Sequence, residues 1–267
     1  MARDFSGGDE PGCLEFGTVA GLATWRQWLG TPGLFRLAVA RVADGQAASG
    51  LLSPDELARA DAFTHGRRRQ QWLAGRVAAK FAAGLLLHRL NGATGEAPAL
   101  APEEWLIDAR SDGRPYLRPP DGIILPVVPD ISISHSGDLA VAMAVSRGYC
   151  GIDIQQSSAK VLKVRERFCL NRETVILDRD PALAGLDAIG RHTLLWAAKE
   201  AVIKATGRRC LEIGLEKVVG PPDSQEETGY LFEMAIHRTG EFAKETMPCK
   251  VVAMFLEDYA LAFTVAG

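Results

Sequence analysis

Residues 72–80 read Trp-Leu-Ala-Gly-Arg-Val-Ala-Ala-Lys, and residues 196–204 read Trp-Ala-Ala-Lys-Glu-Ala-Val-Ile-Lys. Each stretch lies in a longer segment with apolar residues at helical spacing, from about residue 67 to 90 and from about 191 to 206. Shared Trp, Ala and Lys positions are a weak repeat signal by themselves. They agree, however, with the order of elements, because strand-like segments follow each helix. The sequence therefore predicts two similar α+β lobes.

The remaining elements follow from local signals. The segment Ser53-Pro54-Asp55-Glu56 starts a short helix, since its serine can cap and its glutamate completes a capping box. Asp112-Gly113 is the turn of a hairpin, Asn91-Gly92 ends the first long helix, and Gly207 ends the second. A mixed helical stretch covers residues 160–177. We expect further strands at 34–42, 131–135, 139–145, 149–154, 215–219, 229–237, 249–256 and 259–265. The expected domains are a loose arm at 1–30, anchored by Trp25 and Trp28, an N-terminal lobe at 31–147 and a C-terminal lobe at 148–267.

Composition excludes several classes of protein. The chain has 267 residues, of which 47% are apolar, so it can bury a core and is not globally disordered. Lys+Arg 30 against Asp+Glu 33 gives a net charge of −3, which argues against bulk nucleic acid as the partner. The five cysteines form no CxxC pair and the five histidines show no zinc-type spacing. With no signal-peptide pattern and no stretch of about 20 apolar residues, we expect a cytoplasmic protein without a membrane partner.

Three segments carry candidate chemistry. Gly151-Ile-Asp-Ile-Gln155 places a carboxylate in a β-branched strand, where it is costly unless it is hydrogen-bonded or functional. Glu200 and Lys204 share one helix face, either as an ordinary surface ion pair or as the polar lining of a cleft. The segment 132–137, Ser-Ile-Ser-His-Ser-Gly, suits contacts to an anion or nucleotide. A structural histidine, or a Ser–His nucleophile without the GxSxG elbow, is the alternative for this third segment.

These segments occur in an order that resembles a known family. Gly113-Arg114-Pro115, Ser134-His135-Ser136, Gly151-Ile152-Asp153 and Trp196-x-x-Lys199-Glu200-Ala201-x-x-Lys204 follow one another as in the 4′-phosphopantetheinyl transferase superfamily, surfactin-synthetase-activating type. The match runs from about residue 53 to 204 and leaves out the N-terminal arm. The resemblance implies an α+β fold, a pseudo-twofold monomer of two similar lobes, each a long helix packed on an antiparallel sheet. It also implies transfer of 4′-phosphopantetheine from coenzyme A (CoA) to a serine of an acyl or peptidyl carrier protein, with release of adenosine 3′,5′-bisphosphate.

The resemblance also assigns roles to individual residues. It makes Asp153, Gln155 and Glu200 the ligands of Mg²⁺, with Mn²⁺ as an alternative cation. The catalytic residues are then Asp153, Glu200 and Lys204, where Lys204 stabilises charge on the bridging or leaving oxygen. Either Glu200 or a metal-oriented water is the base for the carrier serine, with Glu173 as an assisting base. The expected CoA contacts are Arg59, Arg67, Arg114, Ser134, His135, Lys199 and Lys204.

One position departs from many relatives, which have an acidic residue where this chain has Gln155. An amide carbonyl can ligate Mg²⁺ but brings no charge, so we expect an active enzyme that needs more Mg²⁺ than a three-carboxylate relative. If Gln155→Glu left the Mg²⁺ requirement unchanged, the ligand assignment would be wrong.

Two other functions stay open from the sequence. The fold could serve a catalytically weak CoA- or carrier-binding protein, or a hydrolase could use Ser134 or Ser136 with His135. Carrier proteins are generally acidic, so a docking surface here must be local and basic. The segment 160–172 offers Lys160, Lys163, Arg165, Arg167 and Arg172 mixed with apolar residues; a plain amphipathic helix is the alternative.

Overall fold

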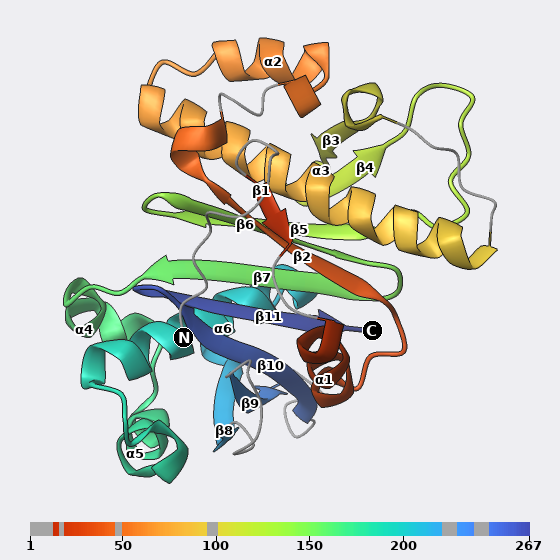
Figure 1. Ribbon diagram of the computed structural model, residues 1–267. Helices are drawn as coiled ribbons and strands as arrows, with labels where there is room; N and C mark the ends of the chain where they lie inside the picture. The colour runs from red at the N-terminus through yellow and green to blue at the C-terminus, as the bar shows by residue number, and fades with distance from the viewer. Residues whose placement is uncertain (1–12, 16–18, 46–49, 95–100, 221–228, 238–245) are drawn as a thin grey trace. The chain divides into compact units, whose positions relative to one another are not determined.

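The computed structural model describes residues 13–15, 19–45, 50–94, 101–220, 229–237 and 246–267 (Figure 1). The chain forms two compact units, the first built mainly from residues 32–150 and the second from 18–31 and 151–266. The boundary falls inside strand β7 (Tyr149–Gln156), between Cys150 and Gly151. We describe each unit by itself.

The first unit is an antiparallel sheet with a long helix packed on it. The strand order is β1-β2-β6-β5-β4-β3. Its strands are β1 (Cys13–Glu15), β2 (Phe35–Arg41), β3 (Leu106–Ala109), β4 (Pro115–Arg118), β5 (Asp130–Ser136) and β6 (Leu139–Val145). Helix α3 (Gly66–Thr94) contacts β2, β5 and β6, and the short helix α2 (Pro54–Asp61) contacts α3 and β3. Leu73, Val77 and Leu86 of α3 are fully buried in this core, and each contributes about 1.5–3 kcal/mol by leaving water.

The second unit repeats this arrangement. Its sheet has the order β7-β11-β10-β9-β8, where the other strands are β8 (Ile213–Val219), β9 (Tyr230–His237), β10 (Thr246–Leu256) and β11 (Tyr259–Ala266). Helix α6 (Ala188–Thr206) packs on β10 and β11. Two shorter helices, α4 (Lys160–Val164) and α5 (Asn171–Arg179), lie on α6 and β8. The α+β class, with a long helix on an antiparallel sheet in each unit, is therefore confirmed.

Local signals placed most element ends correctly. Ser53 caps α2 in a capping box with Glu56, and Gly207 ends α6 with φ +69°. The turn at Asp112-Gly113 joins β3 to β4, with Gly113 at φ +86°. The predicted stop at Asn91-Gly92 is wrong, because α3 continues to Thr94; a single glycine is tolerated inside a helix.

The predicted arm at 1–30 differs most from the structure. Residues 1–12 and 16–18 lie outside the described residues. Residues 13–15 pair with β2 in the first unit, and α1 (Val19–Leu29) packs on β10 in the second. Trp25 of α1 is buried, with its ring edge against Phe263 at a centroid distance of 5.4 Å. Most of the described part of this segment is therefore structured, and it is shared between the two units.

Candidate active site

The predicted catalytic residues come together in the second unit because β7 crosses α6 at very close range. A Cβ placed on Gly151 would lie 1.8 Å from the carbonyl oxygen of Ala201, so only glycine fits there. Alternate residues of a strand point to one face, and this face of β7 therefore presents Asp153 to α6 as well. On α6, Glu200 and Lys204 are four residues apart and share one side of the helix.

Asp153 is buried and fully engaged. Its Oδ1 accepts a hydrogen bond from the Lys204 ammonium at 2.7 Å, and its Oδ2 accepts one from the amide nitrogen of Gln155 at 2.9 Å. Lys204 also donates to the carbonyl of Ile152 at 2.9 Å. The side chain of Asp153 is 4% exposed and that of Lys204 is 28% exposed. A buried carboxylate is thus stabilised by an ammonium that still reaches solvent.

Glu200 is half-buried beside this pair. Burial raises the pKa of its carboxyl group, the negative charge of Asp153 raises the pKa further, and Lys204 lowers it in part. A carboxyl group whose ionisation is disfavoured by burial and by a neighbouring carboxylate is typical of a site that takes a cation or moves a proton.

The donor set suits a magnesium ion. Across the described residues, no group of three or more His, Cys, Asp or Glu side chains is placed to hold a metal. Two carboxylates and one amide carbonyl are nevertheless enough for Mg²⁺, which prefers oxygen and keeps several waters. Asp153, Glu200 and Gln155 would supply these oxygens.

Lys199 departs from the prediction that it contacts CoA. Its side chain has no exposed surface, and its ammonium lies 2.8 Å from Glu173 Oε2 and 2.6 Å from the carbonyl of Phe168. Glu173 accepts two more hydrogen bonds, from the backbone nitrogens of Leu170 at 2.6 Å and Leu215 at 2.7 Å. This buried pair ties α5 and β8 to α6. Lys199 is therefore structural, and Glu173 is not available as an assisting base.

The first unit contains the same arrangement. Lys80 of α3 lies 2.6 Å from Glu56 Oε2, both side chains are fully buried, and the ammonium donates to the carbonyl of Trp105 at 2.6 Å. Glu56 accepts from the backbone nitrogens of Ser53 at 2.9 Å and Ile107 at 3.0 Å. In each unit a glutamate therefore caps the start of its short helix, binds an edge strand and pairs with a lysine of the long helix.

This correspondence changes the register of the sequence repeat. Matching Trp72 with Trp196 pairs Lys80 with Lys204, whereas the hydrogen bonds pair Lys80 with Lys199. The predicted duplication of the architecture is correct. However, Lys80 and Lys204, which match in the sequence, make different contacts, whereas Lys80 and Lys199 make equivalent ones.

The predicted CoA residues lie in the first unit, apart from the two lysines of α6. Arg114 binds both carboxylate oxygens of Asp130, with Nε at 2.9 Å from Oδ1, and donates to the carbonyl of Cys150 at 3.0 Å. Its guanidinium also lies over the ring of Tyr149. Asp130 in turn accepts from the backbone nitrogen of Cys150 at 2.8 Å. Through these bonds Arg114 connects the start of β4 to β5 and to the start of β7. A CoA contact by Arg114 stays a prediction.

Arg59 and Arg67, the other two arginines predicted to contact CoA, differ in their surroundings. Arg59 is 2.7 Å from Asp108 Oδ1, and this hydrogen bond lowers the pKa of the Asp108 carboxyl group. Arg67 stands in the first turn of α3 with 69% of its side chain exposed, 3.5 Å from Asp138. It lines a surface pocket of about 540 Å³ together with Arg41, Val42, Ala43, Gln70 and Asp138. Arg41, which the sequence analysis did not select, is the second arginine of this pocket and follows a buried apolar run.

Ser134 is buried and His135 is exposed, both on β5. Consecutive residues of a strand point to opposite faces, so Ser134 and Ser136 share a face that His135 does not. This geometry argues against a Ser–His nucleophile, and the hydrolase alternative has no support. Within the described chain, no helix is long and apolar enough to span a membrane.

A family model matches the segment that carries the candidate catalytic residues. Residues 149–264, which include Asp153, Gln155, Glu200 and Lys204, match the family model of the 4′-phosphopantetheinyl transferase superfamily. This segment is similar to that superfamily over most of the second unit. The resemblance seen in the sequence motifs is therefore confirmed at superfamily level.

Two curated relatives support the same assignment. The chain is 30% identical over 161 residues to 4′-phosphopantetheinyl transferase HetI of Nostoc sp. (strain PCC 7120), a match that covers 58% of this chain and 60% of the relative. It is 27% identical over 183 residues to slr0495 of Synechocystis sp. (strain PCC 6803), whose name assigns it provisionally as a 4′-phosphopantetheinyl transferase. This match covers 68% of this chain and 66% of the relative. The matches thus span less than two thirds of the length of either relative.

Proposed function

We propose that this protein transfers 4′-phosphopantetheine from CoA to a serine of an acyl or peptidyl carrier protein. The main support is the constellation of Asp153, Glu200 and Lys204 where β7 meets α6, inside the segment that matches the superfamily. Such transfer depends mainly on positioning and on neutralising phosphate charge.

In the proposed step, the serine oxygen attacks the phosphorus next to the pantetheine arm. A new O–P bond forms, the bond to the bridging oxygen breaks, and adenosine 3′,5′-bisphosphate leaves. Lys204 offers a cation to the bridging or leaving oxygen. Glu200, whose carboxyl pKa is raised by burial, is placed to accept the serine proton. Asp153, Glu200 and Gln155 would hold Mg²⁺, which would neutralise pyrophosphate charge.

The mass of an apo carrier protein tests this proposal. Incubation with the protein, CoA and Mg²⁺ should add one phosphopantetheine group per carrier, and Lys204→Met should abolish or strongly slow the gain. The alternative of a catalytically weak CoA- or carrier-binding protein predicts CoA binding without a mass gain. No gain across acyl and peptidyl carriers would overturn the transferase assignment.

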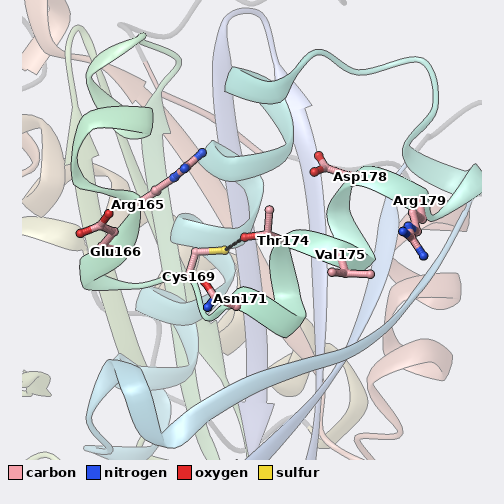
Figure 2. A pocket seen from close by; sticks show the side chains of 8 residues that line it. All are labelled: Arg165, Glu166, Cys169, Asn171, Thr174, Val175, Asp178 and Arg179. Carbon is pink, nitrogen blue, oxygen red and sulfur yellow. Dashed lines mark hydrogen bonds between the residues drawn. The ribbon is translucent and has the colours of Figure 1, made fainter.

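We place the carrier on the basic segment around α4 and α5. Lys160, Lys163, Arg165 and Arg167 are exposed. Of the apolar residues of the segment, Val161 and Phe168 are buried in the core, whereas Leu162 and Val164 are half-buried. A neighbouring hollow has a volume of about 310 Å³, and Arg165, Val175 and Arg179 are among the residues that line it (Figure 2). Val175 is 49% exposed and offers an apolar contact in this hollow, which Glu166 and Asp178 line together with the two arginines. This combination suits an acidic carrier surface with an apolar anchor.

A further inference from the structure

Both carboxylate oxygens of Asp153 accept hydrogen bonds from side chains of the second unit. The Lys204 ammonium takes Oδ1 at 2.7 Å and the Gln155 amide takes Oδ2 at 2.9 Å. An amide oxygen facing a carboxylate oxygen would be repelled, so the nitrogen of Gln155 must face Asp153. The Lys204 ammonium and the Gln155 NH₂ group are therefore bound to the two carboxylate oxygens that a cation would need.

A divalent cation on these oxygens is disfavoured while both donors are in place. At a cation–oxygen distance near 2 Å, a metal on Oδ1 would lie close to an ammonium 2.7 Å from the same atom. Gln155, in turn, must turn its amide to offer an oxygen instead of its NH₂ group. Lys204 is the mobile member, because 28% of its side chain is exposed while Asp153 is buried.

We propose that Lys204 and Gln155 form a lock on Asp153, and that a pyrophosphate-bearing nucleotide opens it by drawing Lys204 away. The proposal rests on the proposed function, which supplies CoA as that nucleotide. Cation and nucleotide then bind with positive coupling, and the coupling is reciprocal. The nucleotide-free protein binds cations weakly, since the lock must break first.

Cation binding without nucleotide is the decisive measurement. Mn²⁺ is titrated into the full chain and free Mn²⁺ is followed by electron paramagnetic resonance, with and without CoA. For the wild type, CoA should tighten Mn²⁺ binding by about 5- to 150-fold. Equal Mn²⁺ affinity with and without CoA would overturn the proposal.

Two variants separate the lock from direct ligation of the cation by CoA. Lys204→Met frees Oδ1, so Mn²⁺ without CoA should bind about tenfold tighter than in the wild type. Gln155→Glu replaces a donor with a ligand and should also tighten binding without CoA. Arg208→Gln, which removes a charge beyond the end of α6, is the matched control and should change little. If Lys204→Met bound Mn²⁺ alone no tighter than Arg208→Gln did, there would be no lock.

Thermal unfolding gives a second measurement. Lys204→Met leaves Asp153 buried without its cation, so Mn²⁺ should raise its Tm more than it raises the wild-type Tm. An equal rise in both proteins would count against the proposal. Because neither measurement uses a carrier protein, failure of the lock is distinguishable from failure of carrier modification.

Discussion

At the scale of single residues, the ionised carboxylate of Glu200 lowers the stability of the folded protein. Burial and the charge of Asp153 raise the pKa of its carboxyl group in the folded chain. The folded state then holds the proton more tightly than the unfolded state, so this contribution to stability is full below the unfolded pKa and is lost as the pH rises through the folded pKa. Ionised Glu200 therefore destabilises the cation-free protein at neutral pH.

We predict that Glu200→Gln stabilises the cation-free protein at pH 7.5 but not at a pH below about 4, where the wild-type carboxyl group is also neutral. Each kcal/mol gained should raise Tm by about 2–4 °C. Thermal melts in a chelator at the two pH values measure the difference. Exposed Glu257→Gln is the control; a gain for Glu200→Gln that is the same at both pH values would contradict the stated cause.

The sequence held the information to separate Lys199 from Lys204, but motif matching hid it. Successive helical residues turn by about 100°, so Lys199 points about 100–140° away from Glu200 and Lys204. The spacing therefore predicts different surroundings for the two lysines. In the structure Lys199 is buried against Glu173, whereas Lys204 is partly exposed and contacts Asp153. Which lysine would be buried depended on the packing of α5 and β8 against α6, which the spacing within α6 does not give.

At the scale of elements, the crossing of β7 and α6 decides whether the site exists. We predict that Gly151→Ala destabilises the protein by about 3 kcal/mol, because the added Cβ would meet backbone rather than a movable side chain. Moving β7 away from α6 also separates Asp153 from Glu200, so cation binding should weaken in the molecules that remain folded.

Gly185→Ala is the matched control for that change, since nothing lies within 4 Å of a Cβ at this position. Urea denaturation gives the stability, and Mn²⁺ titration of the folded protein gives the binding. Wild-type stability in Gly151→Ala would show that β7 and α6 do not pass as closely as the structure has them.

The basic segment of α4 and the turn after it allows a prediction about the partner. Arg165→Glu with Arg167→Glu should weaken carrier binding about tenfold or more while leaving CoA affinity within about twofold, because both side chains are exposed and outside the site at Asp153. Binding of apo carrier and of CoA is measured separately by calorimetry. Exposed Lys250→Glu in β10 controls for net charge, and equal losses for both ligands would remove this surface from carrier docking.

Element types were predictable from the sequence because apolar spacing and caps are local. The buried stripe of α3 and the capping box at Ser53 are examples. The placement of Val19–Leu29 was not predictable, because it depends on the packing of Trp25 against Phe263, more than 200 residues later. For the same reason, the hydrogen bonds between Arg114 and Asp130 were not predictable, since Asp130 belongs to no motif. A CoA contact by Arg114 stays a prediction.

At the scale of the whole molecule, the two units share a buried framework but not a chemistry. In the second unit, Glu200 and Lys204 follow the buried Lys199 by one and five residues. The corresponding positions after Lys80 in α3 are Phe81 and Leu85, which are apolar. The lysine–glutamate pair is therefore a property of the fold, whereas the residues proposed to bind a cation lie in the second unit.

This division predicts different consequences for two equivalent substitutions. Lys80→Met and Lys199→Met each leave a buried glutamate without its partner and should each cost about 3–5 kcal/mol. Lys199→Met should increase hydrogen exchange in α5, α6 and β8 and weaken Mn²⁺ binding, because α6 carries Glu200. Lys80→Met should increase exchange in α2, α3 and β3 and leave Mn²⁺ binding in the absence of CoA near the wild-type value. Hydrogen exchange read by mass spectrometry, with Mn²⁺ titration of the same samples, measures both effects. Equal loss of cation binding in the two variants would contradict the prediction, because the first unit would then support the cation site as much as the second.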